Sequence, residues 1–383
     1  MARLKYWVWL SCIHGVRPLV KYRLVQALGG PEKLFFADGD AMAAAEPLLQ
    51  PREEERLADK SLEAAGKALG FCEEHGISIV TLQDAAYPER LRHIPDPPAV
   101  LYVWGKLPPV DETLLLAVVG TRKATPYGVR MASRLGRELA EGGAVVVSGL
   151  AEGCDSVAME AALRAGGTVV GVLGTAIDEV YPAKNRALFE ETRTRGALVS
   201  EYPPGLRTFP MDFRARNRII TGLSLGVAVV EAPSRSGTRS TAEHALEQGR
   251  DVFAVPGNAD APTSTGCNEL IAQGAAPITG GGDVLRAYSS RNDLFRQKTA
   301  DIHIKKEIDK PRDIVYIDLA DKMRGLPETQ RKVLSAMTRP EMLADEITEA
   351  AGLSAPETLA ALTMLQVAGY VAQGTGKRYT RRS

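Results

Sequence analysis

Glycines, small hydroxyl residues and arginines gather at a few short places in this sequence, and these residue types bind anions. Backbone amides left open by glycine, hydroxyl groups, and guanidinium or ammonium charges all donate hydrogen bonds to phosphate oxygens. The candidates are Gly120, Thr121, Arg122, Lys123, Ser148, Gly149, Lys184, Asn185, Phe213, Arg214, Arg216, Asn217, Arg218, Ser236, Gly237 and Thr238. Together they predict a phosphate-binding crevice.

Within this set, four cations and three hydroxyl groups are expected to converge on phosphate. They are Arg122, Lys184, Arg216 and Arg218, with Ser148, Ser236 and Thr238. Phe213 stands among arginines, where an aromatic ring either stacks on a base or packs in the core. Plainer interpretations exist for single features: a glycine can simply form a turn, and Arg216–Arg218 can be the solvated start of a helix.

The elements that must position these residues are short apolar runs bounded by glycine or proline. Runs without polar alternation are typical of strands buried on both faces, and the amphipathic stretches between them predict helices. The predicted strands are 114–119, 144–147, 168–173, 197–200, 226–230 and 251–255, and the helices 129–141, 156–165 and 241–248. We therefore expect a doubly wound, mainly parallel α/β sheet. Ligands of such sheets bind at the carboxyl ends of the strands, where the candidate residues lie.

No familiar catalytic or nucleotide-binding motif accompanies the crevice. The loop after the first strand, Gly120–Lys123, is not a GxGxxG sequence, and no GxxxxGK[ST] motif occurs. The five histidines are dispersed, and HExxH and GxSxG are absent. The sequence supports neither nicotinamide chemistry nor P-loop hydrolysis, so we expect no cofactor and no catalytic activity.

Composition and charge exclude several classes of protein. The chain has 383 residues, 45% hydrophobic and 25% charged, as in an ordinary globular protein. Its 47 basic and 47 acidic residues balance, which excludes a globally basic nucleic-acid binder, although residues 205–218 hold four arginines against one aspartate. The four cysteines lie too far apart for a zinc site or a small disulfide framework, and reduced thiols fit a cytoplasmic protein. No apolar stretch approaches the ~20 residues that span a membrane.

The pattern divides the chain into four parts. Residues 1–100 predict a small helical domain, which a proline-rich run closes. Residues 101–288 form the α/β domain, and residues 289–325 form a charged linker without clear periodicity. Residues 326–383 predict a second small domain.

That last domain has the outline of a winged helix. The predicted elements are helices 328–337, 343–350 and 355–368 and a hairpin of 370–373 with 378–381. The recognition helix of a winged helix usually lies in the major groove of DNA, but helix 355–368 contains no lysine or arginine. We therefore expect it to contact protein, or weakly the backbone of duplex DNA, rather than to recognise a DNA sequence.

A series of motifs in the α/β domain has the order and spacing of a known family over about 160 residues. The motifs are Val119–Arg122, Tyr127–Gly128, Ser148–Ala151, Tyr181–Pro182 with Asn185, Ser200–Pro204, Arg216–Ile220, Gly222–Ser224, Val230–Ala232, Ser236–Thr238, Gly249–Arg250, Val252–Gly257, Gly266–Ile271 and Gly274–Ala275. In these motifs the domain resembles the DNA-processing protein A family (DprA, also called Smf). Departures are Cys154 and Met159, where the family commonly has Ile and His, and Arg214, where it has Pro.

The resemblance implies an extended Rossmann-like fold between a small helical domain, similar to a sterile alpha motif or helix-hairpin-helix, and a winged helix. It implies binding of single-stranded DNA without catalysis, a homodimer, and loading of the recombinase RecA in natural transformation. It places Arg122, Phe213 and Arg216–Arg218 in a DNA-binding pocket, with Lys184 carried over from a lysine whose position varies among members. Arg122→Ala and Arg218→Ala are each expected to lower affinity for all single strands.

A second interpretation is an enzyme that acts on a nucleotide, with a nucleotide-binding module without catalysis as a variant. The segment Ser236–Thr238 followed by Glu243 resembles the PGGxGTxxE loop of nucleotide phosphoribohydrolases, which are similar in fold. Glu243 would then be the acid or base. The two leading glycines are missing, however, and the glutamate comes two residues late. Release of a free base from a nucleoside monophosphate would distinguish the two interpretations.

Overall fold

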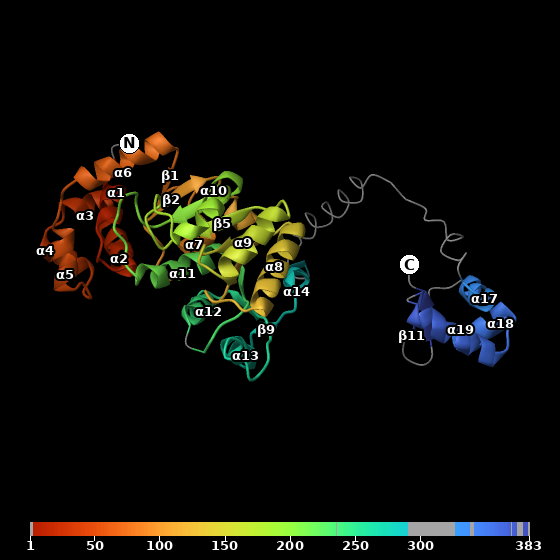
Figure 1. Cartoon of the computed structure of the whole chain (residues 1–383). Coiled ribbons are helices and arrows are strands. Elements are labelled where there is room, and N and C mark those ends of the chain that lie inside the picture. The colour runs from red at the N-terminus through yellow and green to blue at the C-terminus, as the bar shows by residue number, and fades with distance from the viewer. Residues whose placement is uncertain are drawn as a thin grey trace. The chain divides into compact units, whose positions relative to one another are not determined.

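The computed structural model describes residues 3–234, 236–289, 326–337, 341–368, 370–373 and 378–381. The chain forms two compact units, residues 1–305 and 306–383 (Figure 1). The first unit contains a large α/β sheet and the second a small winged helix. Of the predicted linker, residues 290–325 lie outside the described residues.

A nine-stranded sheet in the order β1-β2-β6-β5-β4-β3-β7-β8-β9 forms the centre of the first unit. The strands are β1 Ser78–Thr81, β2 Val100–Gly105, β3 Leu115–Val119, β4 Val145–Ser148, β5 Val169–Val172, β6 Ala197–Ser200, β7 Gly226–Val229, β8 Asp251–Ala254 and β9 Ala276–Pro277. From β6 to β9 all pairs are parallel, which confirms the six predicted strands and the doubly wound sheet. The antiparallel strands β1 and β2 were not predicted. Because β1 belongs to the sheet, the boundary predicted at residue 100 is wrong.

Helices follow the parallel strands, as right-handed crossovers require. They are α8 Pro126–Glu141, α9 Cys154–Arg164, α10 Arg186–Arg195, α11 Asp212–Leu223, α12 Gly237–Glu247, α13 Thr265–Ala272 and α14 Gly281–Ser289. Helices α8 and α9 pack so closely that a Cβ atom at Gly136 would overlap the backbone of Ala158. The parallel strands β3 to β7 are buried along their whole length, which explains their unbroken apolar sequences. No helix in the described ranges is both long and apolar enough to cross a membrane.

Seven helices of the described residues precede or flank β1 and β2. They are α1 Leu4–Cys12, α2 Pro18–Leu28, α3 Pro31–Phe36, α4 Gly39–Ala45, α5 Pro51–Leu57, α6 Glu63–His75 and α7 Glu89–Arg92. Helix α2 ends where Gly29 adopts a φ of 78°, a left-handed conformation that glycine tolerates best. The α1 hydroxyl of Ser11 lies 2.7 Å from the hydroxyl of Tyr102 on β2. The N-terminal helices therefore share one hydrophobic core with the sheet.

The second unit confirms the predicted winged helix. Its elements are α17 Glu328–Ala336, α18 Ala344–Ala351, α19 Ala355–Val367, β10 Glu341–Leu343, β11 Val371–Gln373 and β12 Arg378–Arg381. The three strands form a sheet in the order β10-β12-β11, of which β10 was not predicted. Helix α19 buries Leu362 and Leu365 but exposes Leu359 and Met364. A protein-contacting role for this helix stays a prediction.

Glu53, in the first turn of α5, gives the N-terminal helices a pH-dependent contribution to stability. Its buried carboxylate accepts hydrogen bonds of 2.8–3.1 Å from the backbone and side chain of Arg17 and the backbone of Gln50. Burial alone raises the pKa of Glu53, but these hydrogen bonds outweigh it and lower the pKa from 4.5 to about 2. Because the folded-state pKa is depressed, this stabilisation is present above pH 4.5 and is lost as the pH falls toward 2.

We expect Glu53→Gln to lower the free energy of unfolding at pH 7 by about 2 kcal/mol, less than the full pKa shift because Arg17 is half-exposed. At pH 3 the deficit should shrink to about half, because the wild-type protein has then lost much of the same stabilisation. Urea unfolding at the two pH values measures both differences. Glu63→Gln, which removes an exposed partner of Lys67, is the control and should leave the free energy of unfolding close to that of the wild type at both pH values. An equal deficit at both pH values would contradict the assignment.

Candidate nucleic-acid interface

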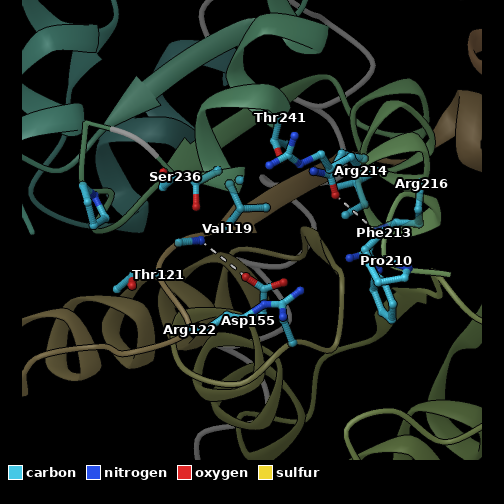
Figure 2. A pocket seen from close by; sticks show the side chains of 17 residues that line it. Val119, Thr121, Arg122, Asp155, Pro210, Phe213, Arg214, Arg216, Ser236 and Thr241 are labelled. Carbon is cyan, nitrogen blue, oxygen red and sulfur yellow. Dashed lines mark hydrogen bonds between the residues drawn. The ribbon is translucent and has the colours of Figure 1, made fainter.

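A pocket of about 330 Å³ lies at the carboxyl ends of β3 and β7 (Figure 2). The order of the strands reverses here, because β4 to β6 follow β3 on one side and β7 to β9 lie on the other. Loops leaving neighbouring strands at such a point diverge and leave a crevice for ligands. The described residues that line it are Val119, Gly120, Thr121, Arg122, Ala151, Asp155, Pro210, Phe213, Arg214, Arg216, Asn217, Ile220, Pro233, Ser236, Gly237, Thr238 and Thr241.

Ten of the sixteen residues predicted from the sequence line this pocket. They are Gly120, Thr121, Arg122, Phe213, Arg214, Arg216, Asn217, Ser236, Gly237 and Thr238. Six do not line it, namely Lys123, Ser148, Gly149, Lys184, Asn185 and Arg218. The sequence analysis missed mainly apolar residues, such as Val119 and Pro210, whose types carry no signal of a ligand.

Two exposed arginines and an aromatic ring lie together at the pocket. The guanidinium carbon of Arg122 lies 5.8 Å from the centre of the Phe213 ring, close enough for a cation–π interaction. Arg214 extends from the first turn of α11 and is also exposed. Within the described residues, neither guanidinium group forms an ion pair. Both are therefore available to a bound anion.

Arg216 lines the pocket but is almost completely buried, with 5% of its surface exposed. Its guanidinium group donates to the carbonyl oxygen of Gly149 at 3.0 Å and also to that of Val172. Burial lowers the pKa of Arg216 to about 10, although nearby Asp155 favours the charged form. The side chain is therefore charged at neutral pH, and it fixes α11 to the loops after β4 and β5.

Asp155, in the first turn of α9, is a pocket residue that the sequence analysis did not select. Its carboxylate accepts a hydrogen bond from the backbone N–H group of Gly120 at 3.3 Å (Figure 2). It also accepts one from the backbone N–H group of Gly149 at 3.1 Å. Burial raises the pKa of Asp155, while Arg216 and these amides oppose the effect. The side chain thus joins the loops after β3 and β4. An acid is unexpected in a phosphate site, so residue type alone argued against it.

The loop after β4 is held in shape by residues first assigned to ligand binding. Leu150 has a φ of 54°, a left-handed conformation that costs a non-glycine residue about 1–2 kcal/mol. The Asn185 side chain donates to the carbonyl oxygen of Leu150 at 2.8 Å, and the buried Ser148 hydroxyl donates to that of Val118 at 2.6 Å. Ser148, Gly149 and Asn185 therefore stabilise the loop after β4 without lining the pocket.

The prediction that Arg218 converges with the other cations is wrong. Only 1% of its side chain is exposed, and Nη2 donates to both carboxylate oxygens of Glu201 at 2.9 Å. Its Nε atom lies 3.0 Å from a carboxylate oxygen of Asp96. Arg218 follows Arg214 by one helical turn, where Asp96 and Glu201 cover α11. The basic cluster in the sequence is thus divided between the pocket and a buried ion-pair network.

The two predicted lysines lie outside the pocket. Lys123 follows Arg122 and is exposed. Lys184 is in the short helix η2 (Ala183–Asn185), and its ammonium group lies 2.6 Å from the carboxylate of Glu152. Both partners of this ion pair are largely exposed, at 60% and 40%. The prediction was that Lys184 converges with Arg122, and in the structure it does not. Its ion pair is exposed, so no buried contact holds the side chain in place.

Glu243, the acid of the enzyme interpretation, is not a pocket residue. It is exposed on α12 and pairs with Arg239 at 3.3 Å. Among the described residues that line the pocket, the acidic one is Asp155, which two backbone amides hold. The described chain also contains no group of three His, Cys, Asp or Glu side chains that could hold a metal ion. The pocket thus lacks the residue on which that interpretation depended.

Comparison with known proteins agrees with this architecture. The family model for DNA recombination-mediator protein A matches residues 78–289, from the first residue of β1 to the end of α14, and the model for the DprA winged helix domain matches residues 320–377. Protein Smf of Synechocystis is 33% identical over 98% of both chains.

Two solved structures are similar to parts of this chain. DNA processing protein A of Streptococcus pneumoniae has 32% sequence identity and a TM-score of 0.64, covering 74% of this chain and 97% of that one. DNA processing protein A of Helicobacter pylori, described for its single-stranded DNA binding mode, has 32% identity and a TM-score of 0.50 over 56% and 96% of the two chains. Since the family model covers more than half of the chain and the Synechocystis relative nearly all of it, the chain belongs to the DNA recombination-mediator protein A (DprA/Smf) family, which takes part in DNA processing for recombination.

Proposed function

We propose that this chain binds single-stranded DNA in the pocket at β3 and β7 and presents the strand to a RecA-type recombinase, without catalysing a reaction. The observation that carries the binding proposal is the pair of exposed arginines beside Phe213, Arg122 and Arg214, which form no ion pair with any residue that the structure describes. Proteins that bind single strands combine positive charge along the phosphates with aromatic rings on which bases stack. The single-strand binding described for the Helicobacter pylori relative supports the same conclusion.

The start of α12 supplies the second half of a phosphate site. The hydroxyl oxygen of Ser236 is buried and has no hydrogen-bond partner among the described residues, although it lines the pocket. A buried polar group without a partner is costly, so a ligand atom is the natural partner for it. Gly237 begins the helix, and no atom lies within 4 Å of the position that a Cβ atom would take there. A phosphate can therefore approach the amides at this helix N-terminus.

The same geometry favours single strands over duplexes. The pocket is concave, and Phe213 lies within its lining. A base can stack on this ring only when it has left the stack of a duplex, which costs a few kcal/mol. The bases of a single strand are unpaired and only partly stacked, so most of that cost is absent. We therefore expect a single strand to bind more tightly than a duplex of the same length.

We also propose that the protein acts as a homodimer. This part and the RecA part of the proposal rest on family membership, because the family model is that of a recombination mediator. We expect the protein to accelerate RecA-dependent pairing of a single strand with homologous duplex, and Arg122→Ala to weaken this effect. Sedimentation equilibrium would test the homodimer. If the protein binds the single strand but leaves RecA activity unchanged, the loading role is contradicted, whereas the DNA-binding part of the proposal stands.

Arg122→Ala is expected to raise the dissociation constant for single strands of any sequence about fivefold at 0.1 M salt, because one phosphate contact is lost. The slope of log affinity against log salt should become less negative by about 0.7. Fluorescence anisotropy of a labelled oligo-dT, titrated at two salt concentrations with a duplex competitor, measures both quantities.

The matched control is Arg164→Ala, because Arg164 is an exposed arginine on α9 outside the pocket lining. The Arg164→Ala variant should keep the affinity and the salt slope of the wild-type protein. Equal behaviour of the two variants would contradict the pocket assignment. If the wild-type protein fails to bind single strands even at low salt, the proposed function is wrong, and release of base from nucleoside monophosphates becomes the next assay.

A further inference from the structure

We propose that Tyr181 provides a second base-stacking position beside the pocket, so that two successive bases of a bound strand rest on aromatic rings. This inference rests on the proposed single-strand binding. The Tyr181 ring centre lies 5.0 Å from that of Phe213, with 52° between the ring planes. Tyr181 does not line the pocket itself, and it lies in the segment between β5 and η2.

The exposure of Tyr181 is the first argument. Its side chain is 48% exposed, which makes it one of the few large apolar groups of the first unit that face solvent. No hydrogen bond within the described residues holds its hydroxyl group. Neither burial nor a polar contact thus accounts for an aromatic ring at this position, whereas a stacked base would cover its open surface.

The fixed position of Phe213 is the second argument. A Cβ atom at Gly174 would come within 2.7 Å of the Phe213 ring, so the ring lies directly against the backbone at that glycine. Arg122 and Tyr181 are its other neighbours, at 5.8 and 5.0 Å from its centre. Phe213 therefore has a planar group near it in Arg122 and another in Tyr181. Guanidinium planes and aromatic rings both accept bases, with little preference for sequence.

A cation next to Tyr181 can hold the phosphate of the same nucleotide. Lys184 follows Tyr181 by three residues, and its ion pair with Glu152 is exposed at both ends. Exposed ion pairs of this kind contribute little to stability, so Lys184 can exchange the carboxylate for a backbone phosphate. Tyr181 and Lys184 would thus repeat, outside the pocket, the combination of ring and cation that Phe213 and Arg122 form at its mouth.

The test compares Tyr181→Ala with Tyr181→Phe in anisotropy titrations of oligo-dT by the full-length protein. Tyr181→Ala should raise the dissociation constant at least about fivefold. Tyr181→Phe should bind with wild-type affinity, because it retains the ring. The salt slope should remain unchanged in both variants, since no charge is removed. Phe36→Ala, which removes an exposed ring on α3, is the control and should have no effect.

A second measurement reports contact with the base directly. An indole at this position, in Tyr181→Trp, should lose fluorescence when oligo-dT binds and keep it when an abasic strand of equal length binds. Wild-type affinity of Tyr181→Ala, or equal quenching by both strands, would overturn the second stacking position while the proposed function stands. If the wild-type protein binds no single strand, the proposed function fails together with this inference.

Discussion

Replacing Arg218 with methionine is expected to lower the free energy of unfolding of the first unit by about 3–5 kcal/mol. Methionine fills a similar volume but leaves Glu201 and Asp96 without their cation, and their side chains are only 13% and 30% exposed. Buried charges without a partner are far costlier than an absent ion pair. Guanidinium chloride unfolding, followed by near-UV circular dichroism, measures the change.

Two further variants separate this effect from a general loss of charge. Arg164→Met breaks an exposed pair with Glu160 and should cost less than about 1 kcal/mol. The double variant Arg218→Met with Glu201→Gln should recover part of the lost stability, because it removes one of the two carboxylate charges that have lost their cation. Stability equal to the wild type in Arg218→Met, accompanied by weaker DNA binding, would contradict the buried role and return Arg218 to the binding site.

Phe213→Ala is expected to weaken binding of single strands by about 1–3 kcal/mol, which corresponds to a factor of roughly 5–150 in the dissociation constant. The ring is the aromatic group within the pocket lining, and it also orders Arg122 through the cation–π contact. The salt slope should change little, because the charges themselves remain. Anisotropy titrations with oligo-dT at two salt concentrations measure affinity and slope together.

Phe209→Ala is the matched control for Phe213→Ala. Phe209 lies four residues earlier, is 40% exposed, and contacts His14 without lining the pocket. Its removal should leave affinity within about twofold of the wild type. If the two variants lose affinity equally, the effect comes from the loop before α11 and the base-stacking role of Phe213 is wrong.

The sheet was predictable because its strands carry a strong and simple signal. Strands β3 to β7 are buried along their whole length, so each appears in the sequence as a largely apolar run with glycine or proline nearby. The pocket followed from the same signal, since the loops after these strands must meet at one edge of the sheet. Strand β1 lacks that signal, because Ser78 is exposed and Ile79 and Val80 are only partly buried at the edge of the sheet.

The positions of the arginines could not be predicted in the same way. Arg214 and Arg218 lie one turn apart on the same side of α11, yet Arg214 is exposed and Arg218 is buried, so position on the helix does not decide which arginine is covered. The sequence shows the charges but not which residues cover each face. The acids that bury Arg218 come from residue 96 and residue 201, far away in the chain. Such long-range pairing leaves no local pattern.

Helix α11 carries the pocket residues and is anchored by two buried guanidinium groups, those of Arg216 and Arg218. One is bound to the loop carbonyls after β4 and β5, and the other is bound to carboxylates on the opposite side. Moving the helix would break both sets of hydrogen bonds at once, so we expect the pocket to have the same shape before and after the proposed binding of a strand. The protein should then lose little conformational entropy when the strand binds. We expect the association rate constant to be set by diffusion and electrostatic steering rather than by a rearrangement of the protein.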